Sequence, residues 1–141
     1  MKAKQIKIIL DTNVLYAGLY SSSGASFKVL QKIESGKIQT VLSTTLLFEY
    51  EAVLKRNQKI LRLSEREIES LLDYFCMQSM HQKIYFLWRP RLPDQKDDHV
   101  LELAVASGTK FIVTHNIKDF RGAEVFGIKA ITPKELLEDT T

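Results

Sequence analysis

Cysteine, proline and glycine are all scarce in this chain of 141 residues, which contains one cysteine, three prolines and six glycines. The single cysteine, Cys76, cannot form an internal disulfide, and no proline- or glycine-rich linker divides the chain. No run of about 18 apolar residues is available to span a bilayer. These absences exclude disulfide-stabilised, low-complexity and membrane-spanning proteins, and we expect one globular domain over residues 1–141.

Charge of one sign is not in large excess either, since 20 Lys and Arg face 17 Asp and Glu, for a net charge of +3. This balance permits a polyanionic partner but does not predict one, because nucleic-acid-binding proteins are recognised by a local basic patch. The N-terminal residues 1–10 contain a short apolar run that no small-residue cleavage site follows. We interpret this run as a strand rather than a signal peptide, and we expect a cytoplasmic protein.

Strand-like and helix-like segments alternate along the chain. Apolar runs predict five strands, at residues 6–10, 38–43, 83–88, 110–114 and 128–131. Helical spacing or capping patterns predict helices at 26–36, at 44–56, after Ser64, at 97–108 and after Thr132. This alternation is typical of an α/β fold with a mainly parallel sheet covered by helices on both faces. Cys76 lies on the apolar stripe of the helix after Ser64, and we expect it to be a core residue.

Acidic residues follow the predicted strands at several points. In a parallel sheet of this kind, ligands bind at the carboxyl ends of the strands. One residue directly follows the first strand, one lies early in the helix after the second, two begin a later helix, and one follows the fourth strand. The sequence therefore predicts that acidic side chains meet at one rim of the sheet: Asp11, Glu49, Asp97 or Asp98, and Asp119.

Such a group of carboxylates favours a metal site. Carboxylates in close proximity repel one another, and a divalent cation removes that conflict. Oxygen ligands without cysteine or paired histidines favour Mg²⁺ or Mn²⁺ over zinc, and such an ion can activate water for attack on a phosphodiester. Taken singly, the same residues also have structural interpretations, since Asp11 could form an Asx-turn and Asp97 or Asp98 could cap a helix. The joint occurrence at one rim favours the metal site.

Four segments, in this order, resemble the PIN-domain family of metal-dependent nucleases: LDTNVL (10–15), LSTTLLFEYEAVL (42–54), DDHVLELAVASG (97–108) and FIVTHNIKDF (111–120). The resemblance extends over nearly the whole chain and is closest to single-domain toxins of toxin–antitoxin systems, related to the VapC type. It implies a three-layer α/β/α fold, cleavage of RNA with Mg²⁺ or Mn²⁺ to leave a 5′-phosphate and a 3′-hydroxyl, and a homodimer. It also implies a small antitoxin protein that blocks the acidic groove.

The resemblance also implies roles for individual residues. The family's four acidic positions fall on Asp11, Glu49, Asp98 and Asp119, and Asp97 is the alternative to Asp98. Further polar residues fall on positions that face the metal (Asn116) or support the carboxylates (Thr12, Asn13 and Thr114).

An RNA substrate requires positive charge around this acidic site. The sequence offers two basic segments, one with Lys55, Arg56, Lys59 and Arg62, and one with Trp88, Arg89 and Arg91. Phosphate contacts would supply affinity, and an aromatic ring would stack on bases. Taken singly, each basic residue is at least as well interpreted as a solvated surface residue, and Trp88 as a core residue.

Three alternatives remain open at this level. A pair among His81, His99 and His115 could cleave RNA without a metal, although no spacing supports a pair. A phosphoryl-transfer or phospho-acceptor domain could use Asp11, but a haloacid-dehalogenase-type site would require Asp at position 13, which is Asn. A non-catalytic module could bind RNA or protein, although the intact acidic set argues against it.

Overall fold

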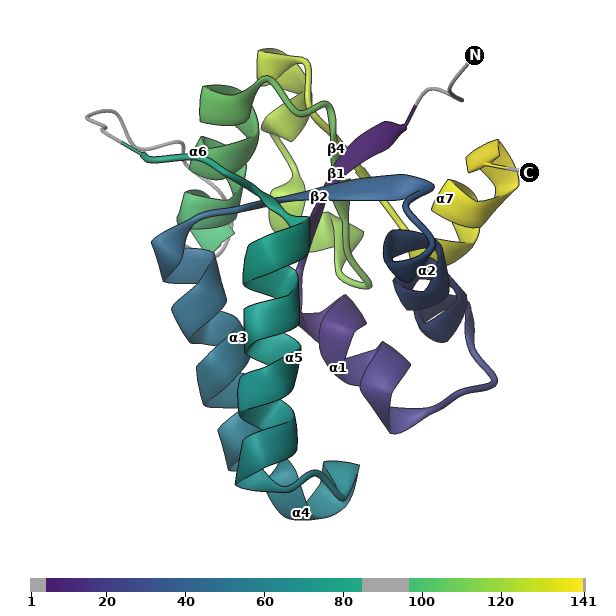
Figure 1. Cartoon of the computed structure of the whole chain (residues 1–141). Helices are drawn as coiled ribbons and strands as arrows, with labels where there is room; N and C mark the ends of the chain where they lie inside the picture. Colours follow the sequence, from purple (N-terminus) through teal and green to yellow (C-terminus); the bar gives the residue numbers. More distant parts are fainter. Residues whose placement is uncertain (1–4, 85–96, 141) are drawn as a thin grey trace.

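The structure is a computed structural model that describes residues 5–84 and 97–140. Five parallel strands form one sheet in the order β3-β2-β1-β4-β5 (Figure 1). Their bounds are Ile6–Leu10 (β1), Ile38–Leu42 (β2), Met80–His81 (β3), Phe111–Val113 (β4) and Lys129–Ile131 (β5). The central strand, β1, pairs with β4 in a register that places Leu10 opposite Val113.

Helices cover both faces of this sheet and give three layers, α/β/α (Figure 1). The first four are α1 (Thr12–Tyr20), α2 (Ala25–Glu34), α3 (Thr44–Arg56) and the short α4 (Gln58–Leu61). The others are α5 (Glu65–Gln78), α6 (Asp98–Ser107) and α7 (Pro133–Thr140), with 3-10 turns η2 (Ile117–Phe120) and η3 (Ala123–Phe126). The predicted α/β fold with a parallel sheet of five strands is confirmed.

Local sequence signals place most helix ends. Ser64 and Glu67 form a reciprocal capping box at the start of α5, and Thr132 and Glu135 do the same at α7. Gly36 has a φ of +82° two residues after α2, where an L side chain would be strained. Ile8, Ile9 and Leu10 of β1 are fully buried, as expected for a central strand covered on both faces.

Three sequence predictions need correction or completion. The third strand lies at Met80–His81 rather than at 83–88; residues 83 and 84 have no regular structure, and 85–88 lie outside the described residues. Helix α1 over Thr12–Tyr20 was not predicted, because an Asp-Thr-Asn turn signal followed by a short apolar run does not show helical spacing. Cys76 is half-buried rather than a core residue.

The order of the strands creates a switch point between β1 and β4. From β1 the chain builds the sheet outward through β2 to β3, and it then returns to the other side of β1 with β4 and β5. Ligands of open α/β sheets bind in the crevice beyond the carboxyl ends of the strands at such a point. The residues just after Leu10 and Val113 therefore occupy the position where a functional site is expected. Within residues 5–84 and 97–140, no helix has both the length and the apolar character to cross a membrane.

Candidate active site at the carboxyl edge of the sheet

Asp11 lies at the switch point and is almost fully buried, with 6% of its surface exposed. Its backbone N–H donates to the carbonyl of Val113 at 2.9 Å, which continues the pairing of β1 with β4 by one residue. Its side chain caps α1, since Oδ1 accepts a hydrogen bond from the Thr12 N–H at 2.9 Å. The structural role of Asp11 is therefore that of a helix cap, where the sequence suggested an Asx-turn, and this role fixes where the carboxylate points.

The second oxygen of Asp11 is held from the neighbouring strand. Thr114, which directly follows β4, donates from its hydroxyl to Asp11 Oδ2 at 2.8 Å. The amide of Asn13 donates to the same oxygen at 3.2 Å, and its own carbonyl oxygen accepts from the His115 N–H at 3.1 Å. Thr12, Asn13 and Thr114, which the resemblance implies as supporting residues, thus each donate a hydrogen bond to the Asp11 carboxylate.

Within the part of the chain that the structure describes, the Asp11 carboxyl accepts hydrogen bonds only from Thr12, Asn13 and Thr114, which are all neutral donors. Burial raises the pKa of Asp11 above its ordinary value, and the nearby Glu49 carboxylate raises it further. The hydrogen bonds from Thr114 and Thr12 and the proximity of His99 only partly oppose this increase in pKa. An ionised Asp11 is therefore under-compensated, as is expected of a group that binds a cation.

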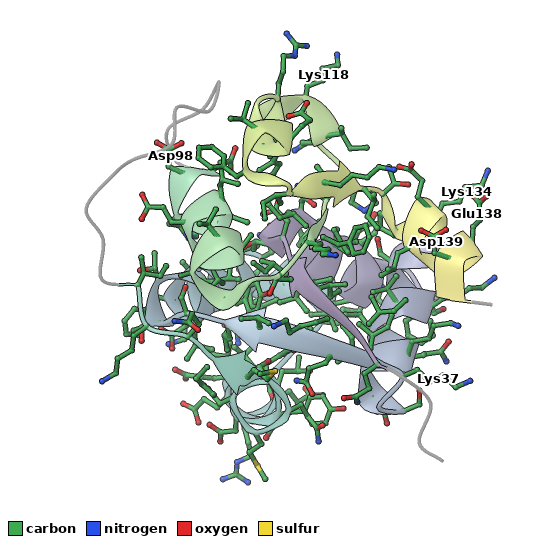
Figure 2. The ribbon with its side chains drawn as sticks, turned by 90° about the horizontal axis from the view of Figure 1, so that it is seen from above. Lys37, Asp98, Lys118, Lys134, Glu138 and Asp139 are labelled. Carbon is green, nitrogen blue, oxygen red and sulfur yellow. The ribbon has the colours of Figure 1, made fainter. Side chains whose placement is uncertain are left out.

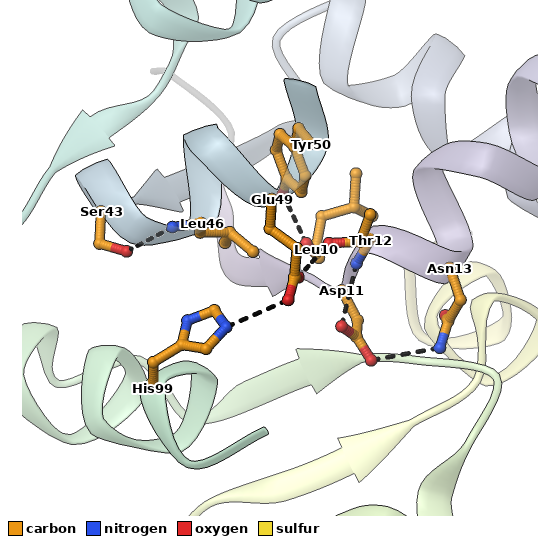
Figure 3. Close-up of polar contacts among 9 residues, drawn as sticks. All are labelled: Leu10, Asp11, Thr12, Asn13, Ser43, Leu46, Glu49, Tyr50 and His99. Carbon is orange, nitrogen blue, oxygen red and sulfur yellow. Dashed lines mark hydrogen bonds and ion pairs between the residues drawn. The ribbon is translucent and has the colours of Figure 1, made fainter. Parts of the chain in front are cut away.

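Glu49 reaches the same place from α3 (Figure 3). One carboxylate oxygen accepts a hydrogen bond from the Thr12 hydroxyl, and the other lies 3.3 Å from Nε2 of His99 on α6. Burial would raise the pKa of Glu49, but the hydrogen bonds from His99 and Thr12, together with the charge of His99, outweigh it and lower the pKa. Thr12 therefore joins two carboxylates, Asp11 through its N–H and Glu49 through its hydroxyl.

His99 is a site residue whose role the sequence did not indicate. It was considered only as one of a pair for metal-free cleavage, and the contact with Glu49 crosses 50 residues of chain. The one available signal was its position beside Asp98, in the first turn of a helix that starts near the rim. Its other ring nitrogen, Nδ1, is buried and makes no hydrogen bond within the described part of the chain.

Tyr50 supports the site from behind. Its side chain is buried beside Phe75, and its hydroxyl donates to the backbone carbonyl of Leu10, the residue that precedes Asp11. Burial, together with the charges of Asp11 and Glu49, raises the pKa of Tyr50 well above its ordinary value, so this hydroxyl remains a donor. Two adjacent residues of α3 thus contribute to the site. Glu49 places its carboxylate in it, and Tyr50 fixes the end of β1 from behind.

The remaining acidic candidates lie farther along the rim. Asp98 begins α6 and is buried, with 4% of its surface exposed, and Asp97 is the residue before that helix. Figure 2 shows Asp98 at the N-terminal end of α6. Asp119 is half-buried in η2, where its backbone N–H donates to the carbonyl of Asn116. The backbone N–H of Asn116 in turn donates to the Thr114 hydroxyl at 3.0 Å, which links this loop to Asp11.

The expected gathering of four carboxylates is only partly formed. Within residues 5–84 and 97–140, no three or more Asp, Glu, His or Cys side chains form a group that could hold a metal ion. The structure brings Asp11 and Glu49 together, with His99 beside them, and the assignment of Asp98, Asp119 and Asn116 as ligands stays a prediction. Of the basic candidates, Lys55 and Arg56 lie at the end of α3, whereas Arg89 and Arg91 lie outside the described residues.

Comparison with known families agrees with this geometry. A family model described as the PIN domain matches residues 7–118, which include Asp11, Glu49, Asp98 and Thr114. The chain belongs to the PIN-domain family. A search of curated proteins finds no match. PIN domains are generally metal-dependent nucleases, so a hydrolase-type enzyme follows at the level of the family.

The oxygen donors of this PIN domain suit the metal that the family generally requires. Mg²⁺ in proteins is commonly held by one or two carboxylates and keeps several waters and substrate oxygens as its other ligands. Asp11 and Glu49 supply two carboxylates joined through Thr12, and the hydrogen bonds to Asp11 offset only part of the cost of burying its charge. These two residues are therefore compatible with a divalent ion, the class of cofactor that the family generally uses.

Proposed function

We propose that this protein is a Mg²⁺- or Mn²⁺-dependent endoribonuclease. The observation that carries the proposal is the pair of carboxylates, Asp11 and Glu49, held side by side at the topological switch point of the sheet. The family is generally one of metal-dependent nucleases, and the net charge of +3 is compatible with a polyanionic substrate.

Asp11 and Glu49 would hold the metal, and Asp98 and Asp119 are further ligands if the substrate complex brings them closer. When bound, such an ion lowers the pKa of a water molecule and neutralises charge on the leaving oxygen. In the proposed reaction, water attacks the phosphorus and the bond to the 3′ oxygen breaks, which leaves a 5′-phosphate and a 3′-hydroxyl. Thr12, Asn13 and Thr114 orient the carboxylates, because each carboxylate oxygen of Asp11 accepts from at least one of them.

The test is cleavage of single-stranded RNA by the purified protein with Mg²⁺, with Mn²⁺ and with a chelator. Asp11→Asn and Glu49→Gln are each expected to reduce cleavage by at least ~100-fold, because outer-shell changes at metal sites already cost 10–100-fold. Asp139→Asn, an exposed acid on α7, is the matched control and is expected to cleave normally. Activity that resists the chelator, or products that end in 2′,3′-cyclic phosphate, would contradict the metal mechanism. Binding of RNA without any cleavage would identify a non-catalytic module.

We further propose that the protein acts in the cytoplasm as the toxin of a toxin–antitoxin pair, as a homodimer with a small protein inhibitor. The support is the resemblance of the four quoted segments to the single-domain toxins. Induced expression is expected to arrest growth of a host cell, and Asp11→Asn is expected to abolish that arrest at equal protein level. Arrest that persists with Asp11→Asn would contradict a toxin role based on cleavage. Sedimentation of the purified protein as a monomer would contradict the homodimer.

A further inference from the structure

A basic hollow lies where α3, α4 and the start of α5 meet, at the far end of α3 from the sheet. We call it the α3–α4 hollow. It has a volume of about 900 Å³ and is lined by Lys55, Arg56, Gln58, Lys59, Ile60, Arg62, Leu63, Ser64 and Glu67. Four cationic side chains therefore surround one hollow within eight residues of sequence.

Most of this positive charge is not neutralised. Lys55 pairs with Glu51 at 3.3 Å, whereas Arg56, Lys59 and Arg62 form no ion pair within residues 5–84 and 97–140. Glu67, the one carboxylate among the described residues that lines the hollow, already accepts the Ser64 N–H in the capping box at 2.9 Å. A region with three uncompensated cations and one engaged carboxylate is complementary to an anionic ligand.

The backbone at Arg62 is an independent sign that a cation matters at this place. Arg62 has φ 57° and ψ 41°, and among the described residues it is the one non-glycine with a positive φ. Glycine or asparagine adopts this conformation at lower cost, and a turn that ends a helix usually uses one of them. Strained backbone positions of this kind persist where the surrounding structure holds them, and they cluster at functional sites, which adds support for a binding role of this turn.

The hollow is connected to the candidate active site along one helix face. Arg56 follows Glu49 by seven residues, which is two turns of α3 or about 10 Å along the axis. Residues seven apart lie on the same face of a helix, so Arg56 and Glu49 share a face. A linear polyanion bound in the α3–α4 hollow can therefore extend along α3 to the two carboxylates.

We propose that the α3–α4 hollow binds the phosphate backbone of a single-stranded RNA whose scissile phosphate lies at Asp11 and Glu49. This inference rests on the proposed function for the identity of the substrate. No aromatic side chain among residues 5–84 and 97–140 lines the hollow, so this part of the protein offers no platform there for stacking bases. Contacts to phosphates carry no sequence information. The hollow supplies affinity that is independent of sequence, and any sequence preference arises elsewhere on the protein.

The experiment measures binding of a fluorescent oligouridine of about 20 nucleotides by anisotropy, with a chelator present to prevent cleavage. The variant combines Arg56→Gln, Lys59→Gln and Arg62→Asn, because asparagine tolerates the backbone conformation at position 62. The matched control combines Lys28→Gln, Lys32→Gln and Lys37→Gln on and after α2, which removes the same charge outside the hollow. Circular dichroism and thermal unfolding check that both triple variants fold.

The salt dependence of RNA binding shows whether the α3–α4 hollow contacts the phosphates. For single strands, log Kobs falls with log[salt] by about 0.7 per phosphate contact, so losing three contacts lowers the slope by about 2. We expect that change and at least tenfold weaker binding at low salt for the hollow variant, and neither effect for the control. Equal changes in both triple variants, or unchanged binding in the hollow variant, would overturn the proposal. Competition by polyglutamate as strong as that by unlabelled RNA would also overturn it, in favour of an acidic protein partner.

Cleavage kinetics distinguish failure of this inference from failure of the proposed function. If both are correct, the hollow variant has a raised KM and an unchanged kcat, because it loses uniform binding of the substrate. If the wild-type protein cleaves RNA but the hollow variant has an unchanged KM and unchanged binding, the hollow assignment alone fails. If the wild-type protein binds through the hollow but cleaves nothing with either metal, the nuclease proposal fails and the binding site stands.

Discussion

The imidazole Nε2 of His99 lies 3.3 Å from one oxygen of Glu49, and the Thr12 hydroxyl donates to the other oxygen (Figure 3). The carboxylate of Glu49 is therefore held from both sides, by α6 and by the first residue of α1. The backbone N–H of Thr12 also donates a hydrogen bond to the side chain of Asp11, which caps α1. Three helices that are distant in sequence thus fix the relative placement of two carboxylates.

This contact makes His99 a positioning residue for the proposed reaction. We expect His99→Ala to lower kcat/KM for RNA cleavage by about 10–100-fold, the usual cost of removing a group that orients a metal ligand. His99→Gln retains a donor and is expected to restore part of the activity. His81→Ala, which removes an exposed histidine bonded to the Cys76 carbonyl, is the control and is expected to leave cleavage unchanged. Equal activity of His99→Ala and the wild-type protein would show that the contact has no role.

We expect the buried carboxylate of Asp11 to lower the free energy of unfolding of the protein at neutral pH. Burial raises the pKa of its carboxyl, so the folded state binds a proton there more tightly than the unfolded state. At a pH below the ordinary pKa of Asp, both states are protonated and there is no penalty. As pH rises through the raised pKa, the folded state must hold a desolvated carboxylate, and stability is lost.

Asp11→Asn removes that penalty. In metal-free buffer we expect its free energy of unfolding to exceed that of the wild-type protein by a margin that grows as the pH rises from about 3 to about 8. Urea unfolding at several pH values measures the margin, and Asp139→Asn provides the same chemical change at an exposed position. A margin that grows as the pH falls would mean that Asp11 is stabilised as a carboxylate, contrary to its burial.

Prediction from sequence found the two strands that meet at the switch point, since the predicted strands at 6–10 and 110–114 correspond to Ile6–Leu10 and Phe111–Val113. Asp11 and Thr114 directly follow strands that apolar runs identify, and parallel topology alone places the ends of such strands at one edge. Helix α1 was missed because its capping signal, Asp11-Thr12-Asn13, equally describes a turn, and its residues Val14, Tyr16 and Tyr20 favour strands when considered singly. The role of His99 depends on a contact between α6 and α3, and no local pattern encodes that contact.

The third strand was misplaced because β3 is only two residues long, too short for an alternation signal.

Tyr50 links the stability of the sheet to the position of the site. Tyr50→Phe removes the hydroxyl that donates to the Leu10 carbonyl and leaves that acceptor buried without its partner. We expect a loss of about 1–3 kcal/mol in the free energy of unfolding, which is the usual cost of a buried unsatisfied group. Tyr20→Phe, at a site where 63% of the side chain is exposed, is the control and is expected to change stability little. Denaturant unfolding measures both variants, and equal stabilities would contradict a structural role for the Tyr50 hydroxyl.

Gly18 allows the close packing of α1 on α2, and this packing holds α1, and with it Asp11 and Thr12, against the sheet. A Cβ at position 18 would lie 2.5 Å from Cδ1 of Leu30 and 3.1 Å from the backbone carbonyl oxygen of Ser26. The Leu30 side chain can rotate away, but the Ser26 carbonyl belongs to the first turn of α2 and can move only with that helix. We therefore expect Gly18→Ala to destabilise the protein by about 1–3 kcal/mol, although alanine alone would favour the helix by up to about 1 kcal/mol.

Gly24→Ala is the matched control for this substitution, because nothing lies within 4 Å of a Cβ built at position 24. Its φ of −96° is open to any residue, so only a small loss at the N-cap of α2 is expected. Because α1 also carries Thr12, Gly18→Ala should lower RNA cleavage at temperatures where the protein remains folded, and Gly24→Ala should not. If Gly18→Ala proves as stable and as active as Gly24→Ala, α1 and α2 can move apart to accommodate the added methyl group at little cost. The site would then be positioned without that contact, by hydrogen bonds such as those that Thr114 donates to Asp11 and Thr12 donates to Glu49.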